Sequence, residues 1–83
     1  MYRVEFSNKS ENQLKKLEED LQRRIVKVLE RITVNPEDYL ERQAGSSSYK
    51  LRIGDYRLIV DLDKKREIIF VIKLGHRKNI YKF

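Results

Sequence analysis

The chain has 83 residues, with 19 Lys and Arg against 13 Asp and Glu, one His and no Cys. This length suits a single domain over residues 1–83 with one small core. The lack of cysteine excludes disulfides and thiolate metal sites, and a single histidine excludes a histidine-rich zinc site, so we expect no cofactor. Residues 1–6 lack the unbroken apolar run that is typical of a signal peptide, and no stretch approaches ~18 apolar residues, so we expect a soluble, cytoplasmic protein without a membrane partner.

The first residues carry the pattern of a short strand that leads into a helix. Residues 2–6 alternate apolar with polar side chains, which is typical of a half-buried strand. Ser7 and Asn8 then offer N-cap oxygens. Glu11 follows Asn8 at the spacing of a capping box, so a helix should begin there.

The helical pattern continues through about residue 33. Apolar residues keep helical spacing from Leu14 to Ile32. Asp20 is a possible second N-cap, and two short helices suit so small a domain better than one rod, so we expect a helical hairpin with a break near Asp20. The helix should end before Pro36, because the residue before a proline is disfavoured in the α conformation. Residues 37–48 are expected to form a flexible connection.

The rest of the chain is strand-like, and we expect strands over residues 49–53, 56–62 and 67–74. Gly54-Asp55 is the Gly-X pair of a two-residue type II′ hairpin. The run Ile68–Ile72 has no polar alternation, which predicts a central strand covered on both faces. The expected fold class is therefore α+β: a short N-terminal strand, a helical hairpin, and a three-stranded antiparallel meander in one twisted sheet.

The positive charge lies in the second half of the chain. Residues 1–41 carry 8 Lys and Arg against 9 Asp and Glu, whereas residues 42–83 carry 11 against 4. Along residues 49–53 the cations alternate with apolar residues, which is typical of one face of a sheet. Such a face favours a polyanion, and RNA is the leading candidate.

A two-residue hairpin loop would place Arg52 opposite Arg57, with Lys50 on the same face. Like charges directly opposite each other destabilise a hairpin, so stability does not explain this arrangement. The structural alternative is that these side chains are splayed and solvated, as exposed cations commonly are.

The C-terminal segment adds the side chains that RNA cleavage without a metal would need. The 2′-hydroxyl must lose a proton, the phosphorane charge must be matched, and the leaving 5′-oxygen must gain a proton. Arg57 and Arg77 suit the phosphate, because a guanidinium binds two oxygens and stays charged. The candidates for proton transfer are Tyr81, His76 and Lys50, of which Lys50 is crowded by arginines. The sequence leaves open which is the acid and which the base.

Four segments together resemble a known family, the RelE branch of the RelE/ParE toxin superfamily. They are Tyr49-Lys50-Leu51-Arg52, Gly54-Asp55-Tyr56-Arg57-Leu58-Ile59, Val71-Ile72-Lys73-Leu74-Gly75-His76-Arg77 and Ile80-Tyr81. The resemblance implies a RelE-like fold and the toxin of a type II toxin–antitoxin pair. Such a toxin is a metal-independent endoribonuclease that cuts mRNA in the ribosomal A site and leaves a 2′,3′-cyclic phosphate.

The resemblance also implies roles for individual residues. Arg57 and Arg77 would stabilise the phosphate, and Lys50 and Tyr81 would transfer protons or stack on a base. Some members use a histidine near the late arginine, which is the place of His76. The residues expected to contact RNA or rRNA are Arg52, Lys73 and Lys78.

The partners implied are the ribosome with its mRNA and a RelB-like antitoxin. That antitoxin would be an acidic, partly disordered chain that folds as it binds. Two other functions remain open. One is ParE-like inhibition of DNA gyrase without RNase activity, against which the combination of Lys50, Arg57, Arg77 and Tyr81 argues. The other is non-catalytic nucleic-acid binding, for which the basic face alone would suffice.

Overall fold

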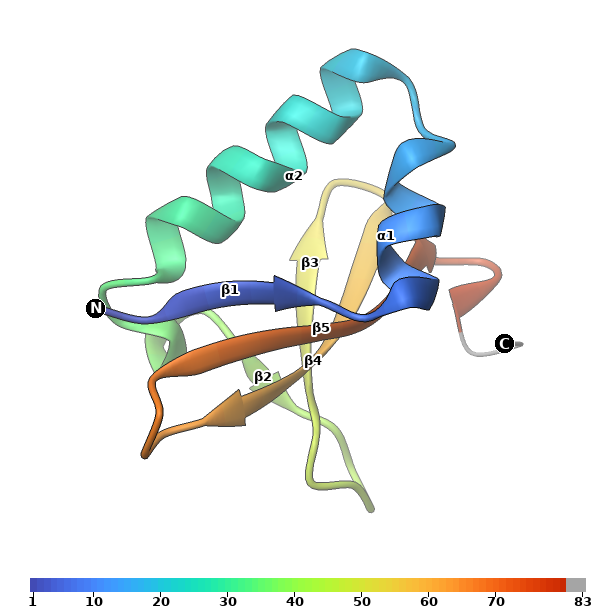
Figure 1. Cartoon of the computed structure of the whole chain (residues 1–83). Coiled ribbons are helices and arrows are strands. Elements are labelled where there is room, and N and C mark those ends of the chain that lie inside the picture. Colours follow the sequence, from blue (N-terminus) through green and yellow to red (C-terminus); the bar gives the residue numbers. More distant parts are fainter. Residues whose placement is uncertain (81–83) are drawn as a thin grey trace.

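A computed structural model describes residues 1–80 and shows a five-stranded sheet with two helices (Figure 1). The elements in chain order are β1 (Arg3–Phe6), α1 (Asn8–Lys15), α2 (Glu19–Ile32), the 3₁₀ turn η1 (Pro36–Asp38), β2 (Glu41–Arg42), β3 (Tyr49–Ile53), β4 (Tyr56–Asp63) and β5 (Ile68–His76). The strand order is β1-β5-β4-β3-β2. Only β1 and β5 run parallel. The expected α+β fold, with its helical hairpin and antiparallel meander, is confirmed.

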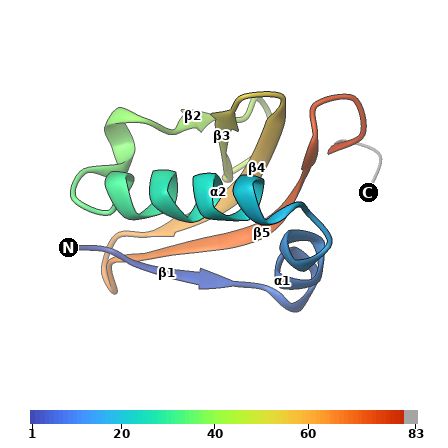
Figure 2. The same cartoon turned by 90° about the horizontal axis from the view of Figure 1, so that it is seen from above.

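The core lies between α2 and one face of the sheet. Ile25, Leu29 and Ile32 follow the helical repeat along one side of α2 and are almost fully buried. They share a cluster with inward-facing residues of the three long strands, such as Leu51, Leu58, Val60, Ile69 and Leu74. Figure 2 shows α2 running across the twisted sheet, with α1 at the end of β1. Neither helix has the length and apolar content that crossing a bilayer requires.

The N-cap of α1 is one of the two residues expected, but the expected capping box does not form. Ser7 is the N-cap, and its Oγ accepts a hydrogen bond from the Ser10 N–H at 3.0 Å. Asn8 is already helical, so Glu11 is one position too late to complete a capping box. Glu11 instead forms an ion pair with Lys15 at 3.1 Å on the exposed side of the helix.

The break between the helices is confirmed, but the predictions of Asp20 as the N-cap of α2 and of a flexible connection after α2 were wrong. Glu18 is the N-cap of α2 and makes no side-chain cap hydrogen bond, while Asp20 lies inside the first turn. The connection expected over residues 37–48 contains most of η1 and all of β2. These elements were missed because β2 is only two residues long and has no apolar alternation.

The β3–β4 hairpin has the register that the sequence predicts. Ile53 pairs with Tyr56 and Arg52 with Arg57, so Gly54 and Asp55 are the two loop residues. Gly54 has φ +58° and Asp55 does not have a positive φ, as a type II′ turn requires. β5 is central, as expected, between β1 and β4. Its second face is covered only in part, because Phe70 and Ile72 are half-buried.

Polar residues of α1 and its N-cap hold β5 where its pairing is irregular. Ile59 of β4 pairs with Lys73 and the next residue, Val60, pairs with Val71, so Ile72 is skipped in a β-bulge. Here the Ser7 Oγ donates to the Ile72 carbonyl at 2.6 Å, and the Ser10 Oγ donates to the Val71 carbonyl at 2.8 Å. Beyond Val71, β5 has no pairing with β1, and the Gln13 Oε1 accepts from the Leu74 N–H at 2.8 Å. These contacts fix the last part of β5, which carries the C-terminal candidate residues.

Candidate functional site

Two cross-strand rows carry cations on the face of the sheet opposite α2. In the first row, Arg52 on β3 pairs with Arg57 on β4, which pairs with Gly75 on β5. In the second row, Lys50 pairs with Ile59, which pairs with Lys73. Directly paired residues point to the same side of a sheet, so Lys50, Arg52, Arg57 and Lys73 share one face.

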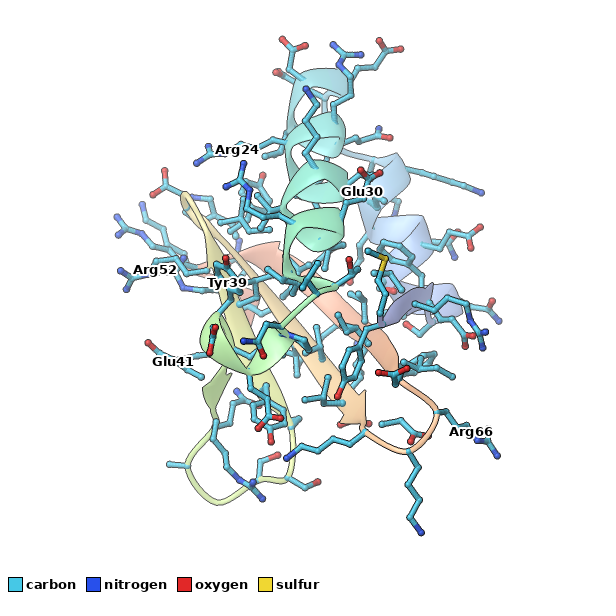
Figure 3. All side chains as sticks on the ribbon, turned by 90° about the vertical axis from the view of Figure 1, so that its left-hand side faces the viewer. Arg24, Glu30, Tyr39, Glu41, Arg52 and Arg66 are labelled. Carbon is cyan, nitrogen blue, oxygen red and sulfur yellow. The ribbon has the colours of Figure 1, made fainter. Side chains whose placement is uncertain are left out.

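Three of these cations line a small cavity of about 180 Å³ near the β2 edge of the sheet. The cavity is lined by Lys50, Arg52 and Arg57 together with Tyr39 and Glu41. The β2–β3 pairing places Glu41 opposite Lys50, and the Glu41 Oε2 lies 3.6 Å from the Lys50 Nζ. This carboxylate partly offsets the crowding of Lys50 by arginines. Figure 3 shows Tyr39, Glu41 and Arg52 on one side of the molecule and Arg66 on the other.

Both candidate phosphate-binding arginines contact the Gly54-Asp55 turn or the residue next to it. The Arg57 Nη1 donates to the carbonyls of Gly54 and Tyr56, each at 3.0 Å. The Arg77 backbone N–H donates to the Asp55 carbonyl at 2.7 Å, and its Nε lies 3.9 Å from the Asp55 Oδ1. The last ion pair is exposed and therefore weak, so a bound anion can displace it.

Arg24 of α2 reaches the same turn. Its guanidinium lies so close to Gly54 that a Cβ on that glycine would be 3.0 Å from the Arg24 Nη1. Figure 3 shows Arg24 on the same side of the molecule as Arg52. The turn is therefore flanked by arginines from a helix, a strand and the segment after β5.

His76 lies beside the turn at the end of β5. It pairs with Tyr56, and the two rings meet edge to face with centroids 5.5 Å apart. The His76 Nδ1 accepts a hydrogen bond from the Lys78 N–H at 3.2 Å, which leaves Nε2 as the protonated nitrogen of the neutral ring. Lys78 itself is exposed. Tyr81, the remaining candidate from the sequence, lies outside the described residues.

The family assignment follows from comparison with known proteins. The sequence model of the family described as the ParE toxin of type II toxin–antitoxin systems, parDE, matches residues 4–81 of this chain. The chain belongs to this ParE toxin family. A comparison of this ParE-family toxin with curated proteins finds no match.

Solved structures with the fold of this ParE-family toxin come from RelE proteins and their complexes. A chain of the RelBE2 toxin–antitoxin complex from Mycobacterium tuberculosis has a TM-score of 0.81 at 22% identity, with 92% of this chain and 98% of that chain covered. The isolated E. coli RelE toxin has a TM-score of 0.76 at 22% identity, with 92% of this chain and 84% of that chain covered. A chain of the archaeal RelE–RelB complex from Pyrococcus horikoshii OT3 has a TM-score of 0.74 at 26% identity, with 92% of this chain and 94% of that chain covered. The resemblance to the RelE/ParE superfamily and the RelE-like fold are confirmed.

The sequence did not identify Tyr39, Glu41 or Arg24 as residues near the site of this ParE-family toxin. Tyr39 and Glu41 come from the connection that was expected to be flexible. Pro36 was the available signal, since a proline followed by two acidic residues is typical of a short helical turn. Within residues 1–80, no three His, Asp or Glu side chains gather closely enough to hold a metal ion.

Proposed function

We propose that this toxin cleaves mRNA in the A site of the ribosome and so inhibits translation and arrests growth. The 2′-oxygen bonds to the adjacent phosphorus as its proton passes to a base on the enzyme. The P–O5′ bond breaks as an acid on the enzyme protonates the leaving oxygen, and the products are a 2′,3′-cyclic phosphate and a 5′-hydroxyl. The reaction needs no metal in this scheme, because fixed cations match the phosphorane charge.

The orientation of Arg57 is the observation that carries this proposal. Its Nη1 donates to two backbone carbonyls of the turn, those of Gly54 and Tyr56. Within residues 1–80, no group accepts a hydrogen bond from its Nε or Nη2. These two nitrogens form the edge of a guanidinium that binds two phosphate oxygens side by side. Arg57 is therefore held in place before RNA arrives, which is how a preorganised charge lowers a barrier.

The other candidates supply the second charge and the protons. Arg77 meets the same turn as Arg57 and would hold another oxygen of the phosphate. Lys50 and Tyr81 are the first pair of proton carriers, and the His76 Nε2 is the alternative. Arg52, Lys73 and Lys78 would bind the flanking phosphates of mRNA or rRNA.

An antitoxin is the second partner we propose. The structures of similar fold include RelB–RelE complexes from bacteria and archaea. An acidic segment that folds as it binds would neutralise the basic face of this toxin, and charge complementarity would speed its association.

The test is primer extension on a defined mRNA in ribosomes with an empty A site, alongside the same RNA free in solution. Cleavage should occur on the ribosome only, and Arg57→Ala or Arg77→Ala should slow it by about 10²–10³-fold, as for loss of other preorganised charges. Arg66→Ala is the matched control. It removes an exposed arginine whose ion pair with Asp63 lies on the opposite side of the molecule (Figure 3).

Arg57→Ala and Arg77→Ala should also relieve growth arrest in cells, while each variant stays folded and still binds the antitoxin. Growth arrest that persists in the Arg57→Ala, Arg77→Ala double variant would refute the proposed chemistry.

Inhibition of DNA gyrase is the second candidate, because the family model that matches this chain is that of the ParE toxin. A supercoiling assay with purified gyrase, run beside the ribosome assay, separates the two functions. Inhibition of supercoiling by both the wild type and Arg57→Ala, without cleavage of mRNA, would favour this candidate.

A further inference from the structure

Tyr39 is held firmly by its backbone, while half of the residue is exposed to solvent. It follows η1, and its N–H donates to the Pro36 carbonyl at 3.0 Å. The next residue, Leu40, donates to the same carbonyl at 3.1 Å. Both Pro36 and Leu40 are buried, yet Tyr39 is 50% exposed. The exposure of the ring is thus set by a tight turn that is anchored on both sides.

Stability does not account for this placement. Tyr39 gives up part of the free energy that a buried ring would contribute. Within residues 1–80, its hydroxyl makes no hydrogen bond that would fix the ring for a structural reason. An exposed aromatic side chain on a rigid turn is, however, a common arrangement for binding.

The neighbours of the ring indicate what it would bind. Among residues 1–80, Tyr39 is the only uncharged residue that lines the cavity shared with Glu41, Lys50, Arg52 and Arg57. The cavity of about 180 Å³ is smaller than the ~300–1,000 Å³ of pockets that enclose a whole small ligand. It suits one part of a larger polyanion, with a flat apolar surface on one side and cations on the other.

We propose that Tyr39 stacks on one nucleobase of the bound RNA while Arg57 holds the reacting phosphate next to that base and Arg52 holds a flanking phosphate. Base stacking on an aromatic ring beside a phosphate-binding groove is how proteins hold single-stranded nucleic acid. An apolar protein segment fits less well, because it would strip water from three cations without replacing that interaction. This inference rests on the proposed cleavage of RNA, and it makes Tyr39 a positioning residue for that reaction.

The test uses ribosomes with an empty A site and an mRNA that cannot be cut because its A-site codon carries 2′-O-methyl groups. 2-Aminopurine replaces each base of that codon in turn, and stacking on the ring should quench its fluorescence at one position. Tyr39→Phe should bind and quench like the wild type. Tyr39→Leu should lose the quenching and bind about 5- to 150-fold more weakly, the range for one base–aromatic stack.

An mRNA with an abasic residue at the quenched position is the matched substrate. Wild type and Tyr39→Leu should bind it equally, because no base remains to stack. Thermal melting of Tyr39→Leu should match that of the wild type, since Tyr39 is already 50% exposed. An equal loss of affinity for the intact and abasic mRNA would mean that the ring only shapes the cavity, and it would overturn the inference.

Cleavage of unmodified mRNA in the same ribosomes separates the two levels of the proposal. If the wild type cuts mRNA but Tyr39→Leu binds and quenches like the wild type, the role of Tyr39 is refuted and the proposed function stands. If the wild type neither binds nor cuts mRNA, the proposed function fails and the role of Tyr39 fails with it.

Discussion

Replacing Gln13 with methionine should destabilise the strand that carries the C-terminal half of the site. The Gln13 Oε1 accepts from the Leu74 N–H at 2.8 Å. Leu74 is 1% exposed, so water cannot easily take the place of the lost acceptor. A buried N–H left unpaired costs about 1–3 kcal/mol. Methionine keeps the length and the apolar contacts of the side chain, so this loss should dominate the change in the free energy of unfolding.

Urea denaturation followed by circular dichroism measures the loss, and thermal melting gives a second readout. For a domain of this size, each kcal/mol should lower the melting temperature by about 4–8 °C. Gln13→Glu is the matched control, since a carboxylate oxygen can accept the same hydrogen bond and should keep most of the stability. The Leu74 amide should exchange its hydrogen faster in Gln13→Met than in Gln13→Glu.

Two results would refute this reasoning. Equal stability of Gln13→Met and Gln13→Glu would show that the acceptor contributes nothing. Unchanged exchange at the Leu74 amide would show that another group or a water molecule takes over the bond.

Two further substitutions test the turn and the cavity. Gly54→Ala should lower the free energy of unfolding in urea by at least about 1–2 kcal/mol, because φ is +58° and the new Cβ would meet Arg24. Gly45→Ala is the control, because Gly45 also has a positive φ, at +72°, but a Cβ there would meet nothing within 4 Å. If Gly45→Ala lowers the free energy of unfolding as much as Gly54→Ala does, Arg24 contributes nothing to the effect. Glu41→Gln removes the carboxylate that lies 3.6 Å from the Lys50 Nζ. Loss of an exposed ion pair worth about 0.2–1 kcal/mol should leave Lys50 more available and tighten RNA binding by a few fold. Weaker binding in a fluorescence titration would contradict this expectation.

The β3–β4 hairpin shows how far the sequence can be used to predict this fold. Gly54-Asp55 selects a two-residue loop, and the loop length fixes every pair along both strands. The shared face of Lys50, Arg52 and Arg57 therefore follows from local chemistry alone. The choice between Ser7 and Asn8 as the N-cap of α1 does not follow from local chemistry, because Ser7 also donates to the Ile72 carbonyl on β5. That contact joins residues far apart in the chain, and no local pattern announces it.

The cavity could be predicted only in part for the same reason. Its cations lie on strands whose alternation is visible in the sequence. Tyr39 and Glu41 are added by η1 and a two-residue strand, whose pairing depends on how the connection after α2 folds back on β3. Arg24 reaches the turn only because α2 crosses the sheet at that point. Such contacts are set by tertiary packing.

The parallel pairing of β1 with β5 constrains the order in which the protein can assemble. Arg3 pairs with Ile68, so β1 has no neighbour in the described sheet until β5 has been synthesised (Figure 1). Contacts this distant in sequence close late, because a long loop must be ordered before they contribute. A nascent chain that stops before β5 lacks both the partner of β1 and half of the arginine pair at the turn. The sheet can therefore be completed only after residues 68–76 have been synthesised.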